Sequence, residues 1–251
     1  MDHDDGVFDE QTAAEYDDAA DPMFDAEVVG ATVDLLAELA GEGPALELGI
    51  GTGRIALPLA ARGVTVHGID LSRPMVAQLR AKPGGEELPV VIGDFSTATA
   101  EGEGRFTLVY LVYNTIMNLT TQATQVDAFR NAARHLAPGG RFLIEVGVPD
   151  LRRLPPGERY VVFDGGDGHW GVDEYDVVEQ GLVSHHLTRR RDGRFAYSSG
   201  PFRYVWPAEL DLMARLAGLD ARDRWAGWAR ESFTSESRSH VSFWQKPLTE
   251  A

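Results

Sequence analysis

Apolar residues along the chain change their spacing in a regular order. Between Glu27 and Ala40 they recur every three or four positions, which predicts a helix that ends at Gly41. Short apolar runs then predict strands Pro44–Ile50, Val64–Asp70, Pro89–Gly93, Phe106–Asn114 and Arg141–Val148. The intervening segments predict helices Gly53–Ala61, Arg73–Lys82 and Thr121–Leu136, with a turn at Pro138–Gly140. Strands that alternate with helices predict an α/β fold with a doubly wound, mostly parallel sheet.

Beyond Pro149 the apolar segments are short and have strand character. They lack the helical spacing seen earlier in the chain. They span Tyr160–Phe163, Trp170–Glu179, Leu182–Arg189 and Phe195–Trp206, with hairpin turns at Gln180-Gly181 and Asp192-Gly193. We expect a small antiparallel β insertion after strand five. A helix at Ala208–Ala217 and an antiparallel final hairpin, Ala221–Trp228 with Val241–Gln245, bring the main sheet to seven strands.

These patterns divide the chain into four parts. They are an acidic N-terminal arm (1–26), a Rossmann-like core (27–149), the inserted β layer (150–206) and a C-terminal helix with strand hairpin (207–251). The net charge is −16, but residues 1–27 hold eleven acidic side chains and no Lys or Arg, so the remaining chain carries only −5. We therefore expect a solvated arm, partly mobile, on which Tyr16 and the stretch Ala19–Phe24 can dock.

The composition also limits which classes of binding partner are expected. An acidic chain disfavours nucleic acid, and the run Arg189-Arg190-Arg191 is more typical of a solvated turn, so a small molecule is the expected partner. With no membrane-length apolar run and no signal-peptide pattern, a cytoplasmic protein without membrane contact is expected. The absence of cysteine excludes disulfides, thiolate metal sites and a cysteine nucleophile. A monomer and a homodimer both stay open.

Three alternating glycines mark the junction of the first strand and its helix. Gly49, Gly51 and Gly53 allow a tight turn and a close approach of the backbone to a ligand. Asp70 ends the second strand, where a carboxylate can accept both hydroxyl hydrogens of a ribose. A nicotinamide or flavin dinucleotide fits the glycine count, but Glu47 beside the loop would repel a pyrophosphate and can instead hold an ammonium group. Asp94, which ends the third strand, can bond the exocyclic amine of adenine.

The motifs E-x-G-x-G-x-G, H-G-I-D-L-S-x-x-M and G-D-F resemble those of class I S-adenosylmethionine-dependent methyltransferases. The resemblance extends over residues 27–149, through Leu111-Val-Tyr-Asn and the turn before strand five, and includes bacterial deoxysugar N-methyltransferases. It departs at Thr107, where many relatives carry Asp. It implies S-adenosylmethionine as the cofactor, with these contacts: Gly49, Gly51 and Gly53 beneath the methionine part, Asp70 on the ribose, and Leu71, Met75, Asp94, Phe95 and Leu111 around the adenosine.

Two further cofactor residues are expected, each with an alternative left open. Arg54 either pairs with the cofactor carboxylate or is a solvated residue at a helix start. Tyr16 resembles the N-terminal tyrosine that closes over the cofactor in related enzymes, or is a loosely packed aromatic residue of the arm.

The residues that contact the methyl acceptor are predicted from their positions in the chain alone. Candidates are Tyr113 and Asn114 after strand four, Glu145 in strand five, and Trp170 and Tyr175 of the insertion. His169, in a glycine-rich loop, is the preferred general base. His185 and His186 point to opposite faces of one strand, so a metal site is not expected.

The resulting prediction is methyl transfer to a nitrogen or oxygen of a small metabolite, in secondary metabolism. A neutral amine can attack without a base, whereas a hydroxyl gains from one. The alternatives are an O-methyltransferase acting on a phenolic or polyketide product, and a protein that binds S-adenosylmethionine without catalysis.

Overall fold

The computed structural model describes residues 8–17, 22–166, 168–190 and 192–248, without the side chain of Arg153. Seven strands form the main sheet in the spatial order β10-β11-β5-β4-β1-β2-β3. In chain order they are β1 (Ala45–Leu48), β2 (Val66–Asp70), β3 (Val90–Ile92), β4 (Phe106–Leu111), β5 (Leu136–Gly147), β10 (Asp220–Trp225) and β11 (Ser239–Gln245). Strand β11 is antiparallel to both its neighbours, and the pairs among β1 to β5 are parallel. The predicted mostly parallel α/β sheet with an antiparallel final hairpin is confirmed.

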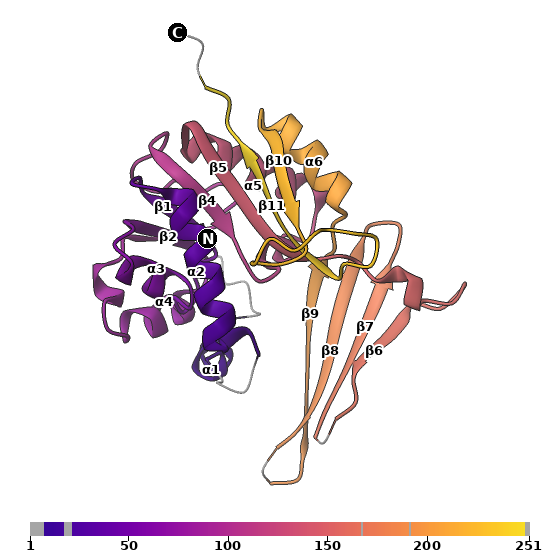
Figure 1. Cartoon of the computed structure of the whole chain (residues 1–251). Helices are drawn as coiled ribbons and strands as arrows, with labels where there is room; N and C mark the ends of the chain where they lie inside the picture. The colour runs from indigo at the N-terminus through magenta and orange to yellow at the C-terminus, as the bar shows by residue number, and fades with distance from the viewer. Residues whose placement is uncertain (1–7, 18–21, 167, 191, 249–251) are drawn as a thin grey trace.

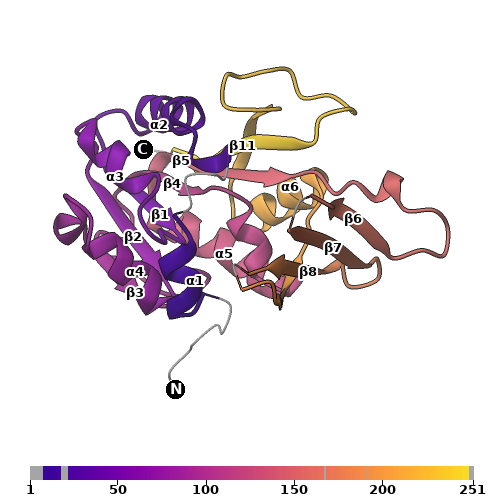
Figure 2. The same ribbon diagram turned by 90° about the horizontal axis from the view of Figure 1, so that it is seen from below.

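Helices lie on both faces of this sheet (Figures 1 and 2). They are α1 (Glu10–Glu15), α2 (Ala26–Ala40), α3 (Ala56–Ala61), α4 (Arg73–Arg80), α5 (Gln122–His135) and α6 (Pro207–Leu216), with 3-10 turns η1 (Pro22–Phe24), η2 (Gly85–Glu87), η3 (Thr115–Asn118) and η4 (Leu151–Arg153). Apolar residues of α2, α3 and α4 pack on one face, and those of α5 and α6 on the other. The longest helix described, α2, has 15 residues, too few to cross a bilayer.

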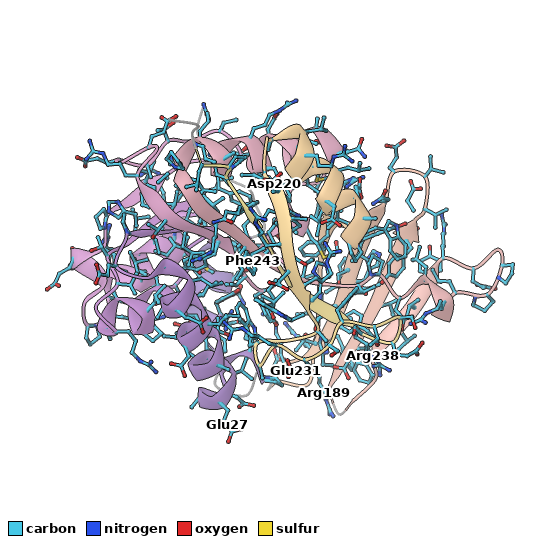
Figure 3. All side chains as sticks on the ribbon, turned by 45° about the horizontal axis from the view of Figure 1, so that its top comes forward. Glu27, Arg189, Asp220, Glu231, Arg238 and Phe243 are labelled. Atoms are coloured by element: carbon cyan, nitrogen blue, oxygen red, sulfur yellow. The ribbon has the colours of Figure 1, made fainter. Side chains whose placement is uncertain are left out.

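A second sheet follows β5 and projects away from the main one (Figure 1). Its order is β6-β7-β8-β9, with every pair antiparallel. The strands are β6 (Tyr160–Asp164), β7 (His169–Asp176), β8 (Gly181–Arg189) and β9 (Phe195–Arg203). The predicted antiparallel insertion after strand five is confirmed. Figure 3 shows Arg189 at the periphery and Phe243 within the main sheet, in line with an exposed Arg189 and a buried Phe243.

Several predicted boundaries were wrong. The helix expected from Gly53 begins at Ala56, since Gly53 has a φ of +79°. Residues 138–140, predicted as a turn, lie inside β5 as a bulge, because Leu136 pairs with Phe106 whereas Arg141 pairs with Leu108. The last hairpin begins at Asp220 and leaves the strand after Trp225.

The N-terminal arm contains a short helix that the sequence patterns did not predict. Residues 10–15 form α1, whose N-cap Asp9 accepts a hydrogen bond from the Thr12 amide at 2.8 Å. This helix packs against α4. The stretch Ala19–Phe24, expected to dock, lies partly outside the described residues, and its described end forms η1.

Candidate active site

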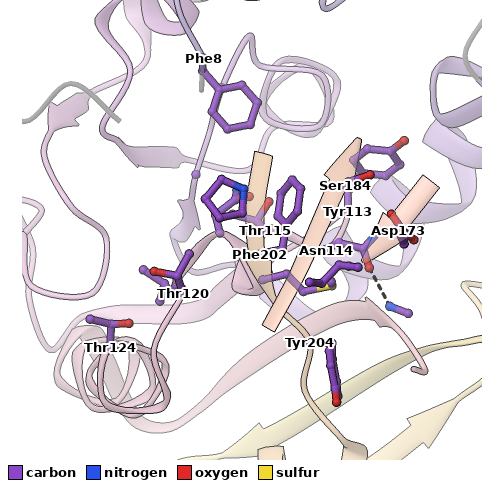
Figure 4. Close-up of a pocket in the computed structure, with 18 of the residues that line it drawn as sticks. Phe8, Tyr113, Asn114, Thr115, Thr120, Thr124, Asp173, Ser184, Phe202 and Tyr204 are labelled. Carbon is purple, nitrogen blue, oxygen red and sulfur yellow. Dashed lines mark hydrogen bonds between the residues drawn. The ribbon is translucent and has the colours of Figure 1, made fainter. Parts of the chain in front are cut away.

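A cavity of about 990 Å³ lies between the carboxyl ends of the main-sheet strands and the insertion, and Figure 4 shows side chains gathered around it. This volume is at the upper end of the range typical of small-molecule pockets. Its lining combines the glycine loop, the arm, the segment after β4 and all four strands of the insertion. Of the predicted cofactor residues, those on the cavity are Tyr16, Gly49, Gly51, Asp70, Leu71, Met75, Asp94 and Phe95.

Asp70 ties the glycine loop to the end of β2. Its Oδ2 accepts a hydrogen bond from the Gly51 amide at 2.6 Å, and its Oδ1 accepts one from the Ser72 amide at 2.8 Å. The residue is only 8% exposed. Each carboxylate oxygen has a second lone pair. These bonds hold the carboxylate at a fixed position on the cavity wall.

The glycine loop requires glycine on two grounds. Gly49 and Gly51 have φ values of +76° and +54°, in the left-handed region. A Cβ on Gly49 would lie 2.5 Å from Thr115 Cγ2. The loop backbone thus lies directly on the cavity, with no room for a side chain at Gly49.

The end of β4 holds two residues in an uncommon conformation. Tyr113 and Asn114 have φ values of +55° and +61°, and both line the cavity. Glu145 Oε2 accepts a hydrogen bond from the Tyr113 amide at 2.8 Å, and Asn114 Oδ1 accepts one from the Gly147 amide at 2.7 Å, the dashed line in Figure 4. Glu145, a predicted substrate residue, does not line this cavity and instead holds the Tyr113 backbone.

The arm is docked over the loop. Ser72 donates from its hydroxyl to the Phe8 carbonyl at 2.8 Å, and Thr52 donates to Asp17 Oδ1 at 2.7 Å. Lys82 Nζ lies 2.6 Å from Asp17 Oδ2. These bonds place the Phe8 and Tyr16 rings, 6.1 Å apart, on the cavity wall.

The insertion contributes one face of its sheet. The inner face places Asp173, Tyr175, Ser184, His186, Phe202 and Tyr204 on the cavity. Trp170, a predicted substrate residue, is on the opposite face, where its ring lies 5.5 Å from that of Phe195, and it does not line this cavity. The expectation that His185 and His186 face opposite ways agrees with the structure, since His185 Nδ1 lies 2.7 Å from the Tyr197 hydroxyl.

His169, the predicted base, is not on the cavity wall either. Its Nε2 lies 3.0 Å from His186 Nδ1, and its Nδ1 lies 2.5 Å from Asp164 Oδ2. His169 therefore lies on the side of His186 that is away from the cavity. Within the described ranges, no group of three or more His, Asp or Glu residues is arranged to hold a metal ion.

Comparison with known proteins identifies the family. A family model described as a methyltransferase domain matches residues 45–140. A Streptomyces protein named cypemycin N-terminal methyltransferase is 31% identical over 198 residues, covering 77% of this chain and 79% of that protein. The chain belongs to the class I S-adenosylmethionine-dependent methyltransferases. This methyltransferase is an enzyme that uses S-adenosylmethionine as its cofactor.

Solved structures agree with this assignment. The structure of the CcbJ methyltransferase from Streptomyces caelestis superposes with a TM-score of 0.86 at 34% identity, covering 98% of this chain and all of that one. The S-adenosylmethionine-bound CalS10, an amino pentose methyltransferase from Micromonospora echinaspora, has a TM-score of 0.65 at 20% identity, covering 96% and 99% of the two chains. The second likeness shows the shared fold alone.

The cavity of the methyltransferase fits this cofactor chemically. The Asp70 carboxylate suits the two hydroxyls of a ribose, and the buried side chains of Met75 and Phe95 offer apolar contact for a base. Asp94, beside them, accepts a hydrogen bond from the Ser96 amide at 2.8 Å through one oxygen. The other oxygen is available for an exocyclic amine.

Four predicted cofactor residues do not line the cavity of the methyltransferase: Glu47, Gly53, Arg54 and Leu111. Glu47 accepts a hydrogen bond from the Tyr110 hydroxyl at 3.0 Å in the interior, and burial raises the pKa of its carboxyl to about 8. Leu111 is fully buried among the residues that face α5 and α6. A Cβ on Gly53 would lie 2.1 Å from Leu79 Cδ1, so Gly53 serves packing against α4.

Arg54 occupies an adjoining cavity of about 390 Å³ that it shares with Tyr113 and Glu145. Its guanidinium donates to the Met23 carbonyl at 2.9 Å and lies 5.3 Å from the centre of the Tyr113 ring. Tyr113 lines both cavities. Arg54 is thus a neighbour of the main cavity rather than part of its wall.

Phe8, Asp173 and Ser184 also line the cavity, although they are not among the residues predicted from the sequence. The period-two alternation of a strand offered one signal, since Asp173 shares a face with Tyr175, a residue already predicted to contact substrate. Phe8 had no such signal, because its place depends on the docking of the arm.

Proposed function

We propose that this methyltransferase transfers the methyl group of S-adenosylmethionine to a nitrogen of a small-molecule amine of secondary metabolism. The observation that supports the amine is the carboxylate of Asp173 in the cavity that also holds Asp70. Burial raises the pKa of Asp173, and a hydrogen bond from the Ser184 side chain opposes this. An ammonium group beside Asp173 would stabilise its ionised form, which makes the site complementary to a cationic acceptor.

The walls around Asp173 suit a small organic molecule. Tyr175 and Tyr204 place their rings 5.6 Å apart, and Phe202, on β9, pairs with Leu182 of β8. Leu182, which pairs with both Tyr175 and Phe202 across the sheet, is buried. An acceptor with an apolar body and one charged nitrogen would satisfy both the rings and the carboxylate.

The residues on the main-sheet side have separate roles under this proposal. S-adenosylmethionine, when bound, supplies a methyl group on a positively charged sulfur. Asp70 holds the ribose hydroxyls, while Asp94 bonds the adenine amine. Phe8 and Tyr16 cover the cavity and exclude water. Positioning and exclusion of water provide most of the acceleration expected of such a displacement.

The name of the 31% identical relative, an N-terminal methyltransferase, also favours nitrogen. An O-methyltransferase acting on a phenolic or polyketide product is the second candidate, supported by the aromatic wall of Tyr175 and Phe202. The two candidates differ in the role of Asp173: its charge would bind an ammonium and so lower KM, whereas for a phenol it would take the hydroxyl proton and so act on kcat.

The test begins with calorimetric binding of the demethylated cofactor, which establishes that the purified protein is folded and binds its cofactor. A panel of amino sugars, aliphatic amines, peptide N-termini and phenols is then incubated with S-adenosylmethionine, and products are detected by the mass gain of one methyl group. We expect methylated amines. Asp173→Asn should raise KM for the amine about tenfold, because a charge-assisted bond is lost. Glu174→Gln, on the adjacent residue and off the cavity wall, is the matched control. Methylation of phenols alone would refute the amine assignment.

A further inference from the structure

A line of hydrogen bonds leads from the cavity along the insertion. Ser184 shares a hydrogen bond with Asp173, and its Oγ lies 3.2 Å from His186 Nε2. His186 Nδ1 lies 3.0 Å from His169 Nε2, and His169 Nδ1 lies 2.5 Å from Asp164 Oδ2. We call the set Asp173, Ser184, His186, His169 and Asp164 the histidine relay.

The register of the insertion builds the histidine relay. Ser184 pairs with Asp173, and His186 pairs with Gly171, so these positions share one face of the sheet. A Cβ on Gly171 would lie 2.1 Å from the Phe163 ring. That ring packs 5.5 Å from the His186 ring, edge to face. Gly171 therefore leaves the space in which Phe163 packs against His186.

The histidine relay runs from a buried end to a solvent-exposed end. Ser184 is 9% exposed, whereas the side chains of His169 and Asp164 are 34% and 43% exposed. Burial, and then the charge of His169, lowers the pKa of His186, with His185 adding to the lowering and Asp173 opposing it. The hydrogen bond from His169 is the main cause that lowers the pKa of Asp164. At neutral pH, His186 is thus uncharged and Asp164 is ionised.

The protons of the relay can be arranged in one direction. Before transfer, the Ser184 hydroxyl donates to the Asp173 carboxylate, His186 Nδ1–H donates to His169, and His169 Nδ1–H donates to Asp164. When Asp173 takes up a proton it becomes the donor to Ser184 Oγ, and the Ser184 hydroxyl turns to His186 Nε2, 3.2 Å away. A proton that enters at Asp173 can then be matched by one leaving each ring in turn.

We propose that the histidine relay removes the proton from the acceptor's ammonium group at Asp173 and delivers it to the rim at Asp164. The proton passes from nitrogen to Asp173 and then to Ser184 Oγ, whose own proton goes to His186 Nε2. The His186 Nδ1 proton goes to His169 Nε2, and water takes the His169 Nδ1 proton at the rim beside Asp164. The neutral amine then forms the nitrogen–carbon bond as the carbon–sulfur bond breaks and its electron pair stays on sulfur. His186 is the ring of the relay nearest the acceptor, and His169 lies behind it and acts through it.

This inference rests on the proposed amine acceptor, but its first test does not. Long-range ¹H–¹⁵N spectra of the protein labelled with ¹⁵N-histidine report the proton position and the titration of each ring. His169→Gln should raise the titration midpoint of His186, since a ring that lowers the His186 pKa is removed. His67→Gln, on β2, is the control. A His186 midpoint that does not move in His169→Gln would overturn the relay.

The second test uses whichever panel amine is methylated. His186→Asn should lower kcat/KM about 100-fold near pH 7 and recover to within about threefold near pH 9.5, where the free amine forms without help. His185→Asn, on the other face of β8, should have the kcat/KM of the wild type at both pH values. A loss in His186→Asn that is equal at both pH values would mean a structural role and overturn the proposal. If His186→Asn does not fold, Asp164→Asn at the exposed rim gives the same comparison. If no panel amine is methylated, the proposed function fails, and the histidine spectra still decide the relay.

Discussion

The substitution Glu47→Gln tests a buried carboxyl that the fold keeps protonated. In the folded chain, burial raises the pKa of Glu47 from 4.5 to about 8, with the Tyr110 hydroxyl and Arg54 opposing this. Between these two values the folded protein holds a proton that the unfolded chain has released. Stability therefore falls as pH rises through this window, because the native state binds more protons than the unfolded state.

The size of the effect follows from the two pKa values. Each pH unit between them corresponds to about 1.4 kcal/mol, so the free energy of unfolding should decline by about 5 kcal/mol from the bottom of the window to its top. Glutamine cannot titrate, and its carbonyl can still accept the hydrogen bond from Tyr110. Glu47→Gln should therefore remove this part of the pH dependence.

The assay is thermal or urea unfolding of both proteins from about pH 5 to about pH 9. We expect the wild-type curve to fall relative to Glu47→Gln and the gap to stop changing above about pH 8. The exposed Glu42→Gln controls for the loss of one carboxylate as such. Parallel curves for wild type and Glu47→Gln would show that Glu47 is ionised in the fold, and would refute the reasoning from burial.

Two other predictions concern the cofactor side. Asp70→Asn should weaken calorimetric binding of the demethylated cofactor at least about tenfold, because the Asn side-chain NH2 group replaces one of the two oxygens that accept bonds from the Gly51 and Ser72 amides. Unchanged affinity in a folded variant would contradict this role. Backbone amides of α1 should exchange more slowly when the demethylated cofactor is added, since Phe8 and Tyr16 line the cavity; equal exchange would mean that the arm docks independently of the cofactor.

The features set by local chain chemistry were predictable from the sequence. The alternation of strands and helices, the left-handed glycine loop and the acids at the ends of β2 and β3 depend on residues close together in the chain. Parallel strands also bring Asp70 and Asp94 to one edge of the sheet, whatever the details of packing.

The tertiary structure decided which face of each element is covered. A period of two assigns Asp173 and Trp170 to opposite faces of β7, but only contact with the main sheet determines that Asp173 faces the cavity. The same holds for Glu47, whose partner Tyr110 is 63 residues away. His169 and His186 meet through the pairing of β7 with β8, which local spacing does not reveal. Burial and register arise from contacts between distant parts of the chain, and these contacts place the residues around the acceptor.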